Sequence, residues 1–109
     1  MKPHVRWPLV RVAVAELSMS PVLEPGDWIV VLRAKTARPG QLVIARHPAQ
    51  PEMLLVKRLI RRVPEGGWYL LSANPAVAAV DSRRFGPVAA LEGRVLFRYR
   101  RAPIITKQA

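Results

Sequence analysis

Apolar residues in this chain gather in short runs, and residues that favour turns separate the runs. Six of these runs are rich in Val, Leu and Ile, which favour extended backbone. The sequence therefore predicts six strands, over Leu9–Ala15, Asp27–Leu32, Gln41–Ala45, Leu54–Val63, Trp68–Leu71 and Gly93–Tyr99. No long segment repeats its apolar positions at the helical period of about 3.6 residues, so the pattern indicates a mainly β fold of coiled or barrel-like sheets.

Proline and glycine mark the connections between these strands. Pro25-Gly26 and Arg38-Pro39-Gly40 predict turns, and Pro64–Gly67 predicts the loop of a hairpin between the fourth and fifth strands. A loop over residues 73–87 and one helical turn over Val88–Leu91 are expected before the last strand. We expect one domain over residues 1–109, with a core at 9–101 and a frayed tail at 102–109.

Composition narrows the function classes. Half of the residues are hydrophobic, which argues against disorder, and the absence of cysteine excludes disulfides and thiolate chemistry. The net charge of +11 would attract nucleic acid, anionic lipid or an acidic partner. The arginines are scattered and no groove-reading motif accompanies them, so a solvated arginine-rich surface is favoured over a nucleic-acid footprint.

The N-terminal segment contains no membrane span in its sequence. Its longest apolar run, Val12–Ala15, lies between Arg11 and Glu16, far below the roughly 20 residues that a bilayer-spanning helix needs. The run is also too short for the apolar centre of a secretory signal. We therefore expect a soluble, cytoplasmic protein.

The candidate chemistry lies in a serine and a lysine. Ser18 precedes Met19-Ser20-Pro21 and the turn at Pro25-Gly26-Asp27, a pattern that predicts a tight, exposed bend after the first strand. A serine hydroxyl is a poor nucleophile unless a base lies beside it. Lys57 is the candidate base, because burial favours the neutral form of an amine and leaves a lone pair that can accept a proton.

Purely structural roles are also consistent with these two residues. Taken alone, a serine beside a Pro-Gly turn is most often a turn serine, and a lysine such as Lys57 is most often a surface residue on an edge strand. Alternation does not decide whether Lys57 or Arg58 points inward, since both faces of the strand are apolar; chemistry favours Lys57, because arginine stays charged. His4 and His47 leave a serine–histidine pair open. No His, Asp or Glu cluster has metal-ligand spacing, so we expect no metal and no cofactor.

Three motifs in order resemble one family. They are Ser18-Met19-x-Pro21 followed by Pro25-Gly26-Asp27, then Val56-Lys57-Arg58, then the box Asp81–Val88. Together they are similar to the type I signal peptidase superfamily of serine–lysine proteases. The resemblance implies a signal peptidase/LexA-like catalytic fold and serine endopeptidase activity.

A finer resemblance rests on fewer residues. Gly67-Trp68 and Asn74-Pro75 are similar to the soluble subgroup, without a membrane anchor, that matures nickel-type superoxide dismutase. That resemblance implies removal of an N-terminal propeptide from the dismutase precursor, which would be the protein partner. It implies no cofactor.

The superfamily resemblance also assigns roles to residues. Ser18 would be the nucleophile, with its N–H in the oxyanion hole, and Lys57 would be the general base. Asp81 and Arg83 would form a salt bridge that supports the site, and Asn74 matches an asparagine of the family. The substrate would bind as an extended strand between about Val12–Leu17 and Leu54–Lys57. The residues expected to contact it are Val14, Ala15, Leu17, Leu55 and Val56.

The chain departs from the family at three places. Glu16 stands where glycine or serine is usual, and its carboxylate would repel an oxyanion unless it points away or pairs with an arginine. Ser72-Ala73 replaces Gly-Asp before Asn74, and Ala79 replaces the serine that orients the lysine in many members. These departures keep a second hypothesis open, a non-catalytic basic module that binds an acidic peptide or nucleic acid.

Overall fold

The computed structural model describes residues 8–14, 19, 22–23, 26–74 and 80–100. Within this part of the chain, extended segments dominate and one short helix, α1, spans Ser82–Phe85. The six strands are β1 (Leu9–Ala13), β2 (Asp27–Arg33), β3 (Leu42–Arg46), β4 (Leu54–Arg62), β5 (Trp68–Leu71) and β6 (Gly93–Arg100).

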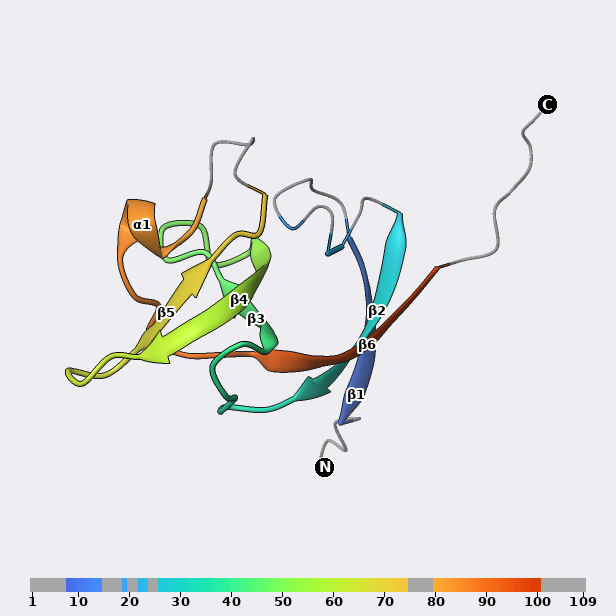
Figure 1. The fold of residues 1–109 in the computed structure, drawn as a ribbon, viewed down its shortest axis with the longest axis horizontal. Coiled ribbons are helices and arrows are strands. Elements are labelled where there is room, and N and C mark those ends of the chain that lie inside the picture. The colour runs from blue at the N-terminus through green and yellow to red at the C-terminus, as the bar shows by residue number, and fades with distance from the viewer. Residues whose placement is uncertain (1–7, 15–18, 20–21, 24–25, 75–79, 101–109) are drawn as a thin grey trace.

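The strands form one antiparallel sheet in the order β1-β2-β6-β3-β4-β5. The last strand in the chain therefore lies in the middle of the sheet, where it pairs with β2 on one side and with β3 on the other. Figure 1 shows the sheet curling so that the β1–β2 pair lies to one side of β6 and the β3–β5 strands with α1 lie to the other. The result is a half-barrel with two halves joined along β6.

The buried side chains form two apolar clusters, of which the first lies within the β3–β5 half and the second joins the two halves. Alternate side chains of β3 point to opposite faces, so that Val43 and Ala45 enter one cluster while Ile44 enters the other. Burying a valine or isoleucine side chain of this kind contributes about 1.5–3 kcal/mol. The first cluster consists of Val43, Ala45, Leu59, Trp68, Leu70, Val88 and Leu91. The second consists of Val14, Met19, Leu23, Ile29, Val31 and Ile44.

The predicted mainly β fold is confirmed, with small differences at the strand ends. The helical turn expected over Val88–Leu91 is wrong. Val88 instead bridges Trp68, since each residue donates its N–H to the carbonyl of the other, at 2.9 and 2.8 Å. The pairing with Trp68 gives Val88 the hydrogen bonds of a strand, and its side chain is buried in the first cluster.

Helix α1 lies in the segment that the sequence pattern assigned to a loop. Asp81 caps it by accepting the N–H of Arg83 at 3.0 Å, and Gly86 ends it with a φ of 81°. Pro87 follows, where a helix cannot readily continue. Among the described residues, no helix is long and apolar enough to cross a membrane.

We expect Gly93→Ala to destabilise the fold, because Gly93 of β6 lies against β2 with no room for a side chain. A Cβ at this position would lie 2.6 Å from Cγ1 of Val31 and 2.7 Å from the carbonyl oxygen of Leu32. Relieving such crowding typically costs about 1–3 kcal/mol. Urea unfolding followed by circular dichroism measures the loss, with the exposed Glu65→Ala as a control that stays near wild type. Equal stability of all three proteins would contradict this account of the junction.

Candidate active site

Lys57 lies in the interior, with none of its surface exposed. It projects from β4 on the same face as the buried residues Leu55 and Leu59. Arg58 belongs to the opposite face and donates to the carbonyl oxygen of Gly40 at 2.7 Å. The Arg58 guanidinium thus lies beside an exposed turn, while the Lys57 side chain is buried in the protein.

The Lys57 amine meets the hydroxyl of Ser72. Nζ of Lys57 donates to Oγ of Ser72 at 2.9 Å. Ser72 directly follows β5, and the pairing of Arg58 with Leu71 sets it across from Lys57. In the family that the sequence resembles, a serine two residues before the aspartate orients the lysine; that position is Ala79, which carries no hydroxyl and lies outside the described residues.

The Asp81 carboxylate holds the backbone of Ser72 in place. Asp81 is fully buried, and its Oδ2 accepts the backbone N–H of Ser72 at 2.8 Å. The Arg83 guanidinium forms a salt bridge with the same carboxylate, with Nη2 2.9 Å from Oδ2. Burial by itself would raise the pKa of Asp81, but the hydrogen bonds from Arg83 and Ser72 and the charge of Arg83 outweigh it, so this pKa lies below its ordinary value. The expected Asp81–Arg83 pair is therefore present, and its service to catalysis stays a prediction.

The described residues on both sides of position 18 pack near the lysine strand. Val14 and Met19 are buried in the second cluster, against which Val56 and Ala73 also pack. These last two residues are the chain neighbours of Lys57 and Ser72. The end of β1, the start of β2 and the end of β5 lie at the same end of the molecule (Figure 1). The predicted site residues Ser18, Glu16, Ala15 and Leu17 lie outside the described residues.

Among the strand edges that lack a strand partner in the described part of the chain, one belongs to β4 and another to β1. β4 pairs with β5 only from Arg58 to Arg62, so residues 54–57 have no strand on that side. Main-chain groups of alternate residues point to opposite edges, and Leu59 bonds toward β3. Val56 therefore presents its N–H and C=O to the open edge, whereas Leu55 faces β3.

The outer edge of β1 is open in the same sense. Val14 donates its N–H to Asp27 and accepts the N–H of Gly26, so both of its main-chain groups serve the junction with β2. By alternation, Ala13 presents its main-chain groups outward. Of the predicted substrate contacts, Val14 and Leu55 thus direct their main-chain groups to β2 and β3, whereas Val56 directs its own to the open edge. Their contact with a substrate stays a prediction.

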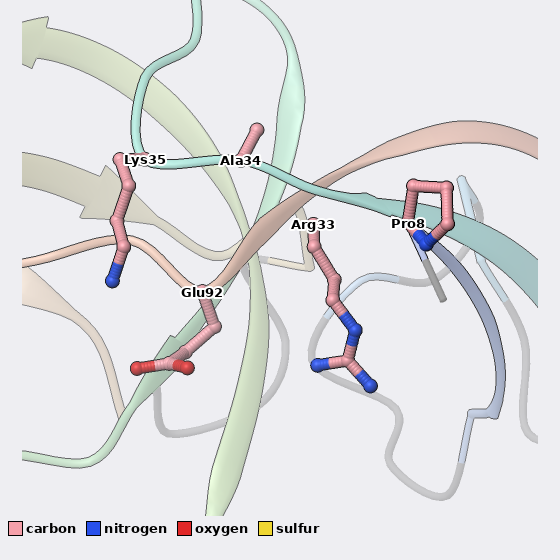
Figure 2. Close-up of a pocket in the computed structure, with 5 residues that line it drawn as sticks. All are labelled: Pro8, Arg33, Ala34, Lys35 and Glu92. Carbon is pink, nitrogen blue, oxygen red and sulfur yellow. The ribbon is translucent and has the colours of Figure 1, made fainter. Parts of the chain in front are cut away.

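A small pocket lies between these strands. It has a volume of about 80 Å³ and is lined by Val10 and Val12 of β1 and by Leu54 of β4, with others from β2 and β3. A second pocket, of about 330 Å³, opens where β2 ends and β6 begins (Figure 2). Its lining is charged and contains none of the predicted site residues: Pro8, Arg33, Ala34, Lys35 and Glu92.

The structure disfavours His47 as a catalytic base. Its Nδ1 accepts the backbone N–H groups of Ala49 and Gln50, at 3.0 and 3.2 Å. In a serine–histidine–aspartate triad this nitrogen instead donates to a carboxylate. His47 thus stabilises its own loop, and His4 lies outside the described residues. Among the described residues, no group of three or more His, Asp or Glu side chains could hold a metal ion.

Comparison with known proteins accords with this arrangement. Residues 8–96 match the peptidase S24-like family, which covers all of the strands up to the middle of β6. The chain belongs to the peptidase S24-like family. No characterised protein matches it closely enough to be compared. Membership supports a serine-protease type of function and agrees with the curled antiparallel sheet.

We expect Asp81→Asn to destabilise this S24-like domain in a pH-dependent way. Since the pKa of Asp81 is lower in the folded than in the unfolded chain, its contribution is complete above about pH 4 and is lost as the pH falls through the folded value. At neutral pH the substitution should cost about 1–3 kcal/mol, the usual penalty for weakening hydrogen bonds to a buried charged group. The gap between wild type and variant should shrink in acid.

Denaturant unfolding at several pH values measures this gap. The matched control is Glu92→Gln, which removes a carboxylate from a more exposed ion pair, 3.4 Å from Arg46. Surface pairs contribute little, so the control should follow the wild-type curve closely. An Asp81→Asn gap that stays constant from neutral pH to below pH 3 would rule out the carboxylate as its source.

Proposed function

We propose that the protein is a serine endopeptidase in which Ser18 is the nucleophile and Lys57 the general base. The observation that carries this proposal is the complete burial of Lys57, whose amine forms a hydrogen bond with Ser72. Lys57 lies on β4, and Val56 of that strand packs against the same cluster as Val14 and Met19, which flank position 18 in the chain. A buried lysine on a sheet is costly and rarely serves stability alone. Membership of the peptidase S24-like family supports the same chemistry.

In this proposal the neutral Lys57 amine takes the proton of the Ser18 hydroxyl as Oγ attacks a peptide carbonyl. The new C–O bond drives the carbonyl electrons onto oxygen, where the N–H of Ser18 stabilises the charge. Collapse of this intermediate breaks the C–N bond, and the lysine ammonium returns its proton to the leaving amine. Water, deprotonated by the same amine, then attacks the acyl carbon; the bond to Ser18 Oγ breaks, and the lysine ammonium protonates Oγ to restore the enzyme.

The two open edges support binding of the substrate as an extended strand. A peptide placed between β1 and β4 would bond with the main-chain groups of Ala13 and Val56. The pocket between Val12 and Leu54 would receive one apolar side chain of modest size. Glu16 would have to turn away from the oxyanion for this to work efficiently. Main-chain recognition of this kind selects unfolded segments, such as a flexible N-terminal extension.

We infer further that the substrate is the precursor of a nickel-type superoxide dismutase, whose N-terminal propeptide would be removed. This inference is supported by the motif resemblance at Gly67-Trp68 and Asn74-Pro75, and by a binding mode that requires an extended chain. It is narrower than the endopeptidase proposal and is tested separately.

We expect Lys57→Met to lower kcat/KM by about 10²–10⁴-fold, the usual contribution of a general base, and Ser18→Ala to remove the nucleophile altogether. Methionine has a similar length and tolerates burial, so the fold should persist. Digestion of a diverse peptide library, with mass spectrometry of the new termini, measures cleavage without presuming a substrate. Lys35→Met, which removes the same charge from an exposed position, should cleave like wild type.

Wild-type cleavage by Lys57→Met would refute the dyad. Coexpression with the dismutase precursor then tests the narrower inference, read from the mass of the processed N-terminus. If the library is cut and the precursor is not, the enzyme stands and the proposed substrate does not.

A further inference from the structure

We propose that Ser72 is the residue that positions the Lys57 amine, and that Asp81 positions Ser72 in turn. The hydroxyl that orients the lysine would thus come from the end of β5, and not from the position of Ala79. The inference rests on the proposed role of Lys57 as a base. It concerns a residue that acts through the lysine and does not touch the substrate.

The register of the β4–β5 hairpin makes this contact possible. Near the loop, Arg61 pairs with Tyr69; continued unchanged, that pairing would set Lys57 opposite Ala73. A bulge between Leu59 and Arg61 shifts the register by one residue, so that Ser72 comes opposite Lys57 instead. A one-residue shift also exchanges the faces of a strand, which brings the hydroxyl to the face of the amine.

Lys57 and Ser72 form the closer of the two kinds of residue pair found in antiparallel sheets. The N–H groups of Leu70 and Ser72 both point away from β4, to Oγ of Ser82 and to Asp81 respectively. Ser72 and Lys57 therefore face each other as a non-hydrogen-bonded pair, in which side chains approach most closely across an antiparallel ladder. A short side chain such as serine meets its neighbour there without displacing the backbone.

Such a contact matters because a lysine side chain does not hold its amine in one position by itself. Its ammonium or amine sits on a flexible four-carbon stem with many rotamers. A hydrogen bond from Nζ to Oγ of Ser72 selects among these rotamers, and a general base must lie within hydrogen-bond reach of the proton that it takes. Loss of the hydroxyl should therefore impair the chemical step more than substrate binding.

Ser72 is itself held in place by hydrogen bonding, unlike a residue that only happens to lie beside the lysine. Its N–H bonds to Asp81, and that carboxylate is fixed by the backbone N–H and the guanidinium of Arg83. The chain of contacts runs from Arg83 through Asp81 and Ser72 to Lys57. In this proposal Asp81 and Arg83 hold in place the Ser72 hydroxyl that orients the Lys57 amine.

The test compares three serine substitutions on a peptide that the wild type cuts. Ser72→Ala should lower kcat by about tenfold to a hundredfold with little change in KM, within the range that a general base supplies. Ser72→Thr keeps the hydroxyl and should restore most of kcat. Ser82→Ala is the matched control, because it removes a buried serine hydroxyl from the same region, one that accepts the N–H of Leu70. It should lower the unfolding midpoint and leave kcat unchanged.

A second readout does not depend on activity. The chain has four lysines, Lys2, Lys35, Lys57 and Lys107, so lysine labelled with ¹⁵N at Nζ gives few signals, and Lys57→Met assigns the one of interest. Ser72→Ala should shift that signal, whereas Ser72→Thr and Ser82→Ala should leave it in place. An unchanged signal in folded Ser72→Ala, or an unchanged kcat, would overturn the positioning role.

The two readouts also separate this inference from the proposed function. If the wild type cuts no peptide, the endopeptidase proposal fails, and the ¹⁵N signal alone decides whether Ser72 holds the amine. If Lys57→Met is inactive while Ser72→Ala cuts at the wild-type rate, the dyad stands and Ser72 has no positioning role.

Discussion

Placing an amine inside a β-sheet domain costs free energy unless the amine finds polar partners, and this constraint shapes the region around Lys57. The lysine amine requires an acceptor, which Ser72 supplies. The backbone at Ser72 leaves β5 and needs an acceptor of its own, which Asp81 supplies. Asp81 in turn caps α1 and binds Arg83. A β bulge, a helix cap and a salt bridge thus serve one buried nitrogen atom.

The sheet divides the proposed chemistry between its two halves. The segment around position 18 joins β1 to β2, whereas the lysine and its supporting residues belong to β4, β5 and α1. The second apolar cluster spans the junction, because it contains Met19 and Ile29 from one half and Ile44 from the other. Packing between the halves, and not any local motif, would therefore set the distance between nucleophile and base.

Much of the fold could be predicted from sequence, because short valine- and leucine-rich runs between Pro-Gly turns leave few alternatives to strands. The inward face of β4 could not be predicted, since its two faces are equally apolar. In the structure Lys57 is buried, and Arg58, on the opposite face, donates to Gly40. Helix α1 was predictable in principle from Asp81, Gly86 and Pro87, which are its cap and stop residues. The contact of Ser72 with Lys57 could not be predicted, because it depends on a β bulge that no feature of the sequence marks.

The central place of β6 has a consequence for how the protein comes into being. Within the described residues, β1–β2 and β3–β5 are joined by strand pairing only through β6, which is the last of the described strands to be synthesised. While the chain is still emerging from a ribosome, its first hairpin and its later meander can each form, but they have no common ladder. The nucleophile and base proposed above would then stay apart until β6 has emerged and paired with both β2 and β3, so a chain that lacks β6 would be unable to cut itself or its neighbours.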